Sequence, residues 1–199
     1  MITWLFMALV VTILFTPGPT NTLLASSGIQ VGVRRSLMLV PAEALGYVVA
    51  ISAWGLLIGY VSDKYPAIPS ILKLFSASYI LYLAIKLWRT QAPEMGQSQE
   101  VATIRARELF YATLLNPKAL LFASAVFPAI VWKNSMAYTS HMLVFIFLII
   151  PIAIFWTCLG AFLVRKKLRW LTPHLLQKFA SVILVFFCIP LSYSAFTSL

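Results

Sequence analysis

The stretch FTPGPTN, residues 15–21, interrupts an apolar run, MITWLFMALVVTIL, that fills residues 1–14. Pro17 and Pro19 each lack a backbone N–H, and each ring clashes with the carbonyl one turn back, so a helix cannot continue through them. The break comes before the roughly 20 residues needed to cross about 30 Å of hydrocarbon. A backbone group freed in lipid costs several kcal/mol unless protein or water satisfies it. The stretch therefore predicts a polar site inside a membrane, shielded from lipid.

The composition places the chain in a lipid bilayer. Of its 199 residues, 61% are hydrophobic and 10% are charged, and the mean hydropathy is +0.93. A typical soluble domain is nearer half apolar and a quarter charged. The net charge of +10 would suggest nucleic acid as a partner of a soluble protein. Here the basic residues lie between apolar spans, so we expect no nucleic-acid partner.

Six apolar stretches, each long enough to span the bilayer, follow one another along the chain. They cover residues 2–29, 36–61, 68–88, 109–131, 139–164 and 174–198. A polar connector, residues 89–108, holds three of the five acidic residues and divides the chain near its middle. We expect an all-α polytopic membrane protein, one domain over residues 1–199, with three spans in 1–88 and three in 109–199. Three spans in each half make the halves inverted repeats.

The basic residues predict the orientation. The first, third and fifth connectors carry ten of them, and the second and fourth carry two, Lys64 and Lys133. Because positive loops stay in the cytoplasm, the odd connectors should lie inside and both termini outside. The N-terminus has no basic n-region and no cleavage site, so residues 2–29 are expected to be a retained span rather than a signal peptide.

A second break appears at the matching place in the second half. LLNPKALLF, residues 114–122, sets Pro117 between Asn116 and Lys118. Paired interruptions at corresponding positions of two halves indicate a transporter site built from broken helices. Counted along straight helices at 1.5 Å per residue, the depths of Pro17 and Pro117 differ by roughly 10 Å. Coincidental kinks are the alternative.

Four blocks of the sequence resemble the LysE/RhtB family of amino acid exporters. They are FTPGPTNTLLASSG with GVRR behind it, SASYILYLAIKLWR, LLNPKALLF, and FPAIV, in the family's order and spacing. The resemblance implies a multi-pass exporter of amino acids or similar metabolites in the bacterial inner membrane, energised by the membrane gradient. The chain departs from the family pattern at Thr20, where an acidic residue is common. The departures surround the expected pathway and leave the cargo open.

The expected substrate pathway comprises the two breaks and one buried acid. Its residues are Thr16, Pro17, Gly18, Pro19, Thr20, Asn21, Glu43, Asn116, Pro117 and Lys118. Amides at half-helix N-termini would bind a substrate carboxylate. Asn21 and Asn116 could satisfy freed backbone groups, contact substrate, or do both.

Glu43 and Lys118 are the charges that lie deepest in the spans. A charge at the bilayer centre costs at least about 2.5–3.5 kcal/mol, so such groups usually line a cavity or pair. We predict that Glu43 and Lys118 share one polar cavity and that breaking their contact lets Glu43 take up a proton. In the alternative, Glu43 is neutral and hydrogen-bonded while Lys118 snorkels to the cytoplasmic surface.

Other classes of function fit less well. An aspartyl hydrolase needs two carboxylates and a zinc peptidase needs HExxH spacing, so we expect no enzyme, cofactor or metal site. A cation or metal-ion transporter of related fold remains the alternative, although such cargo calls for several converging ligands. A non-transporting membrane subunit would leave the buried charges unexplained. The expected partners are a small-molecule substrate, the lipid bilayer and, in a possible homodimer, a second copy of the chain.

Overall fold

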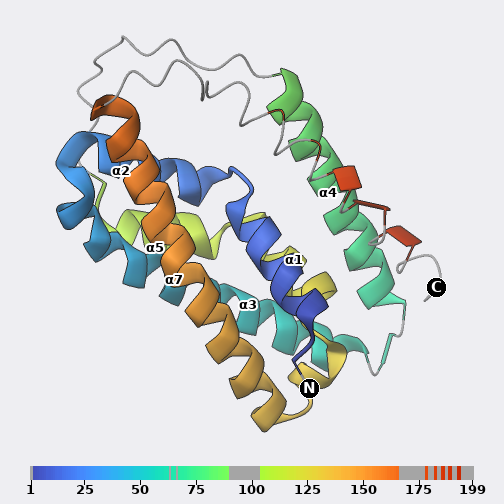
Figure 1. Cartoon of the computed structure of the whole chain (residues 1–199). Coiled ribbons are helices and arrows are strands. Elements are labelled where there is room, and N and C mark those ends of the chain that lie inside the picture. Colours follow the sequence, from blue (N-terminus) through green and yellow to red (C-terminus); the bar gives the residue numbers. More distant parts are fainter. Residues whose placement is uncertain are drawn as a thin grey trace.

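The computed structural model of the chain describes residues 2–62, 64, 65, 67–89 and 104–165, and the single residues 178, 182, 185, 186, 188, 189, 192 and 193. Every regular element in this part is helical (Figure 1). In order they are α1 (Trp4–Phe15), α2 (Pro19–Ser36), η1 (Leu37–Leu39), α3 (Val40–Ser62), α4 (Ile68–Arg89), α5 (Ala106–Leu114), α6 (Pro117–Leu121), the π-turn η2 (Phe122–Val126), η3 (Ala129–Trp132) and α7 (Ser135–Arg165). The expected all-α class is confirmed for these residues, and the sixth span, 174–198, lies almost wholly outside them.

The first expected span is two helices. The Thr3 side chain accepts from the Phe6 amide and starts α1, which ends at Phe15. Thr16 and Gly18, each followed by proline, are extended, as a residue before proline prefers to be. Pro19 then opens α2 as its first residue, where its missing N–H costs nothing. The predicted break is confirmed.

The connector expected between the first two spans is a kink rather than a loop. Helical structure continues from Pro19 to Val61 apart from Gly32, whose φ of 77° and ψ of 169° turn the chain. A positive φ is accessible to glycine at little cost. Arg34 and Arg35 therefore lie in the last turn of α2, and only at Val40 does α3 begin.

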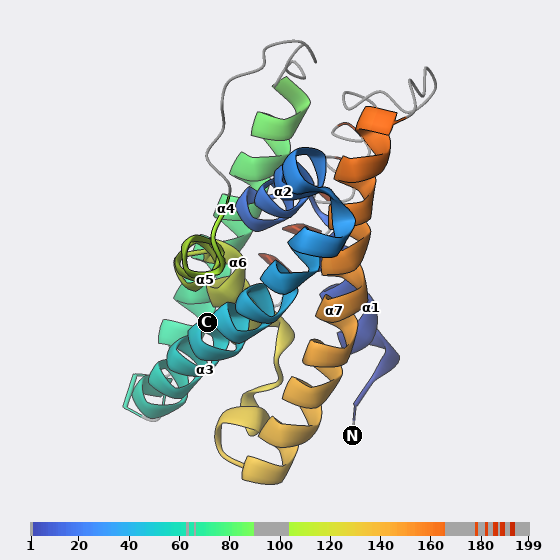
Figure 2. The same ribbon diagram turned by 90° about the vertical axis from the view of Figure 1, so that its left-hand side faces the viewer.

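The fourth expected span is also broken. Leu115 and Asn116 separate α5 from α6, and the axis bends by 45° between α5 and the run Pro117–Val126. Figure 1 shows α5 from the side, lying across the other helices, and Figure 2 shows it nearly end-on. The break predicted at Pro117 is confirmed, but the helix before it crosses the bundle instead of running along it.

Two described helical stretches are long and apolar enough to cross a membrane, Pro19–Val61 and Ser135–Phe162, and a third if the bent pair is taken as one span. Large apolar side chains such as Trp4, Tyr60 and Phe147 cover the outside. The C-terminal ends of α4 and α7 lie at one end of the molecule, and the N-terminus and the start of α7 lie at the other (Figure 1). The helices α4 and α7 thus run in the same direction.

The helix pair α2 and α7 packs backbone to backbone. A Cβ atom added at Gly28 would collide with the Thr157 carbonyl, and one at Gly160 with the Ala25 carbonyl. Small residues allow such close approach between membrane helices. The α7 helix also packs against α1 and α3, so it holds the first break against the rest of the molecule.

Candidate functional site

The two breaks meet inside the protein. Lys118, the second residue of α6, is 3% exposed, and its Nζ donates a hydrogen bond to the Thr16 carbonyl oxygen at 2.6 Å. The side chain therefore does not reach the cytoplasmic surface by snorkelling. It joins the break that ends α1 to the break that begins α6, although 102 residues separate the two.

The Asn21 side chain hydrogen-bonds to backbone carbonyls at the first break. Its Nδ2 donates to the Leu14 carbonyl at 2.7 Å and to the Thr16 carbonyl at 2.8 Å. The last carbonyls of a helix lack partners from their own helix. Here the buried Asn21 side-chain amide donates to two of these carbonyls. The hydrogen bonds described for the Asn21 side chain thus satisfy backbone, and the Thr16 oxygen accepts from both Asn21 and Lys118.

The Asn116 side chain caps the helix that follows the second break and links this break to α2 and α3. Its Oδ1 accepts from the Lys118 amide at 3.0 Å, as a helix N-cap does. Its Nδ2 donates to the Tyr47 hydroxyl at 3.0 Å and lies 3.4 Å from Thr20 Oγ1. Both the oxygen and the nitrogen of the Asn116 side-chain amide therefore have hydrogen-bond partners.

Glu43 lies in the first turn of α3 and is 2% exposed. Its carboxyl group lies near the Thr20 side chain and interacts electrostatically with Lys118. The Thr20 side chain also lies near the Tyr47 hydroxyl, and both accept from Asn116 Nδ2. Glu43 and Lys118 thus belong to one buried polar cluster, joined through Thr20 and Asn116.

The ten residues expected in the pathway divide by role. Pro17, Gly18, Pro19 and Pro117 shape the two breaks. Thr16 contributes its carbonyl, since its hydroxyl bonds back to Thr12 O in its own helix. The side chains that the structure brings together in the cluster are those of Thr20, Asn21, Glu43, Asn116 and Lys118, and Tyr47 joins them.

Tyr47 was not among the residues expected from sequence. It is fully buried on α3, one turn after Glu43, and its ring packs against Phe122 and Phe145. The signal was present, because residues i and i+4 share one face of a helix. A hydroxyl group one turn from a buried acid therefore belongs among the residues that the sequence indicates for the site.

The two breaks differ in how their N-terminal amides are satisfied. At α6 the Asn116 side chain caps the Lys118 amide. At α2 the capping position is Gly18, which has no side chain to offer. In the part of the chain that the structure describes, no hydrogen bond reaches the Thr20 or Asn21 amide. The positive end of α2 is thus available to an anion.

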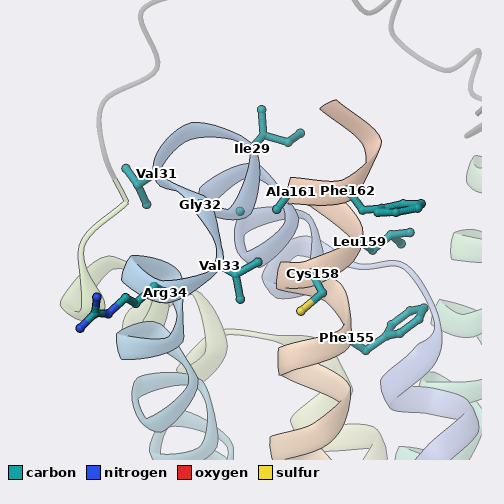
Figure 3. Close-up of a pocket in the computed structure, with 11 residues that line it drawn as sticks. Ile29, Val31, Gly32, Val33, Arg34, Phe155, Cys158, Leu159, Ala161 and Phe162 are labelled. Atoms are coloured by element: carbon teal, nitrogen blue, oxygen red, sulfur yellow. The ribbon is translucent and has the colours of Figure 1, made fainter. Parts of the chain in front are cut away.

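A hollow of about 770 Å3 lies elsewhere, between α2 and α7 around Gly32 (Figure 3). Val33 and Cys158 face each other across it, Phe155 and Phe162 border it, and Arg34 extends away from α7. It shares no residue with the polar cluster. Within the described ranges, no group of three His, Cys, Asp or Glu side chains is placed to hold a metal ion.

The fold and the polar cluster define a helical membrane protein with broken helices at a buried site. Residues 11–195 match the family model described as LysE type translocator, and the chain belongs to that family. It is similar to an uncharacterized membrane protein of Vibrio cholerae serotype O1 (strain ATCC 39315 / El Tor Inaba N16961), with 29% identity over 135 residues that cover 63% of each chain. No solved structure matches the chain.

Proposed function

We propose that this protein is a secondary transporter that exports an amino acid or a close derivative across the bacterial inner membrane. The observation that carries the proposal is the contact between the two breaks, where Lys118 Nζ lies 2.6 Å from the Thr16 carbonyl oxygen. A site formed by two broken helices at the interface of two halves is the arrangement expected of such transporters. Membership of the LysE type translocator family supports the same class of cargo.

The proposed architecture is six transmembrane helices in two inverted repeats of three. Each half opens with a broken helix, α1 with α2 in the first and α5 with α6 in the second. The described residues of the last span support this count, since Cys188 Sγ lies 3.4 Å from the Ala77 carbonyl of α4 and Lys178 lies over the Trp88 ring. A sixth helix beside α4 would complete the second half.

The proposed cargo site is the first break. The free Thr20 and Asn21 amides at the positive end of α2 suit a carboxylate. The Thr16 carbonyl, at the negative end of α1, suits an ammonium group. Since an amino acid carries both charges a few ångströms apart, one zwitterion can bridge the break between the two helices.

Proton exchange would energise export through Glu43. Its carboxyl group is buried, lies near the Thr20 side chain and interacts electrostatically with Lys118. A carboxyl group in such a place marks a proton or substrate pathway in membrane proteins. We propose that movement of Lys118 away from Glu43 favours protonation of Glu43, and that return of Lys118 favours release of the proton.

The test is export from proteoliposomes that contain the purified full-length chain. Each common amino acid, radiolabelled, is loaded in turn, and release is followed with and without a proton gradient; Mg²⁺ and Zn²⁺ are assayed in parallel. We expect gradient-dependent release of one amino acid or a small group of them, and no release from empty liposomes. Release of the divalent ions with no amino acid would replace this proposal by the cation-transporter alternative.

A further inference from the structure

We infer that Lys118 occupies a binding position for a primary ammonium group, which the ammonium of the cargo takes over during transport. This inference rests on the proposed function and assigns roles within the same site. In the structure, the Lys118 ammonium lies at the Thr16 carbonyl. The cargo ammonium replaces it there, and the released Lys118 pairs with the cargo carboxylate.

The position has the chemistry of a cation site. The Thr16 carbonyl is at the C-terminal end of α1, where the helix dipole adds about half a negative charge. Unwound carbonyls and half-helix C-termini are the groups that coordinate cations in broken-helix transporters. Here the atom at that place is an ammonium nitrogen of the protein itself, at 2.6 Å.

The Lys118 ammonium has donors left for a second partner. An ammonium has three N–H donors, and the structure describes one hydrogen bond for Lys118 Nζ, to the Thr16 carbonyl. The Glu43 charge attracts it from nearby without forming an ion pair among the described contacts. A four-carbon stem with rotatable bonds lets the charge move between partners.

Space beside the ammonium is provided by Gly18. A Cβ atom at this residue would lie 3.1 Å from both Cε and Nζ of Lys118. The Gly18 backbone is extended, with φ −164° and ψ 178°, so its conformation does not demand glycine. The missing side chain instead leaves room for a charged group at the end of α1, whether this belongs to Lys118 or to cargo.

The exchange predicts that cargo carries two charges. An amine without a carboxylate would displace Lys118 and leave a second buried ammonium with no anion, which is costly in a low-dielectric site. A carboxylate without an ammonium would leave Lys118 at Thr16, and its only hydrogen-bond donors would be the free amides at the start of α2. A zwitterion satisfies the Thr16 carbonyl and Lys118 together.

The decisive experiment removes the lysine and supplies an amine. Lys118→Ala deletes the atoms that propylammonium contains, so the detergent-purified full-length variant is heated with propylammonium, tetramethylammonium or sodium chloride. We expect propylammonium to raise its melting temperature above that in either other salt, and to do so far less for the wild type, where Lys118 fills the position. Tetramethylammonium has the charge but no N–H. Lys64→Ala, which removes an exposed lysine, is the matched control and should behave as the wild type.

Equal responses of Lys118→Ala and wild type to propylammonium would overturn the inference. If Lys118→Ala aggregates, the same salts are added during solubilisation, and recovery of monodisperse protein becomes the readout. A second arm compares L-alanine with L-alanine methyl ester. The ester should stabilise Lys118→Ala more than it stabilises the wild type.

Failure of the inference can be told apart from failure of the proposed function. Amino acid release from proteoliposomes without any propylammonium effect would remove the exchange and leave the exporter. A propylammonium effect in a protein that releases no amino acid would leave an ammonium site in a transporter of another cargo.

Discussion

At the scale of single residues, the Thr16 carbonyl is the point on which the site depends. It accepts hydrogen bonds from Asn21 Nδ2 at 2.8 Å and from Lys118 Nζ at 2.6 Å. Bonds to a charged donor contribute about 1.5–3 kcal/mol, and leaving a buried charge unpaired costs more. Substitutions that disturb these two donors should therefore have measurable and separable effects.

Gly18→Ala should lower stability only when Lys118 is present. The new Cβ would lie 3.1 Å from Cε and Nζ, so the ammonium must shift by a few tenths of an ångström from Thr16. We expect a loss of about 1 kcal/mol, or roughly 2–4 °C in melting temperature for a chain of this size. In the Lys118→Ala background the crowded atoms are gone, and the same substitution should be neutral. An equal loss in both backgrounds would assign the effect to the backbone.

Glu43→Gln and Lys118→Met should be coupled in a double-mutant cycle on export rate. Each single change leaves the other charge buried without its electrostatic partner. The double mutant should therefore lose less than the two single losses combined, with a coupling energy of about 0.5–3 kcal/mol. Strictly additive losses would show that the two charges act independently, and membrane levels of each variant provide the control.

At the scale of elements, broken helices and close helix crossings set the geometry of the site. The breaks expose one carbonyl end and one amide end of neighbouring half-helices, and α7 packs against α1 and α2 on either side of the first break. A change that makes the first helix continuous should abolish export, whereas a change that separates α2 from α7 should lower the melting temperature.

Replacing Pro17 and Pro19 together by alanine should abolish export while preserving membrane insertion. A continuous helix would pair the Thr20 amide with the Thr16 carbonyl, as i and i−4 do. The free amide at the start of α2 and the carbonyl that holds Lys118 would then be consumed by each other. Export at the wild-type rate from a well-expressed double mutant would show that the break is not needed. Pro151→Ala, within the continuous helix α7, serves as the proline control.

Gly160→Val should destabilise the protein by loosening α2 from α7. The added Cβ collides with the Ala25 carbonyl, and overpacking against backbone costs about 1–3 kcal/mol or more. Cys158, two residues earlier on α7, is exposed, so Cys158→Val should change the melting temperature little. Equal melting temperatures for the two variants would contradict the close crossing.

At the scale of the whole molecule, the charge pattern predicts how the chain sits in the membrane. Lys64 follows α3 at one end, and Arg107 lies near the start of α5, beyond the connector that follows α4. Both side chains are exposed. The positive-inside rule puts the first outside and the second in the cytoplasm.

Labelling of single cysteines should test this orientation. With Cys158 and Cys188 replaced by serine, Lys64→Cys should react with an impermeant thiol reagent in intact cells. Arg107→Cys should react only after the membrane is opened, and the cysteine-free protein gives the background. Reaction of position 107 from outside would reverse the topology.

Much of the site could be predicted from sequence because its signals are local. Proline removes a donor and blocks the preceding turn wherever it stands, so the breaks at Thr16–Gly18 and at Asn116 follow from the positions of the prolines in the sequence. Glu43 and Lys118 stand out because charges are rare in apolar spans. The helical class likewise follows from long apolar runs, since backbone groups in lipid must bond within their own segment.

The contact between the breaks was decided by tertiary structure. Counting residues along straight spans put the two prolines at different depths, but α5 lies across the bundle (Figure 2) and carries Asn116 and Lys118 to the end of α1. The tilt of a helix is set by packing against its neighbours rather than by its own length. Packing also decided that Lys118 turns inward to Thr16 and that Tyr47 joins Asn116. The sequence by itself determined where the helices break and which charges are buried, while the directions of α5 and α7 determined which broken ends face each other.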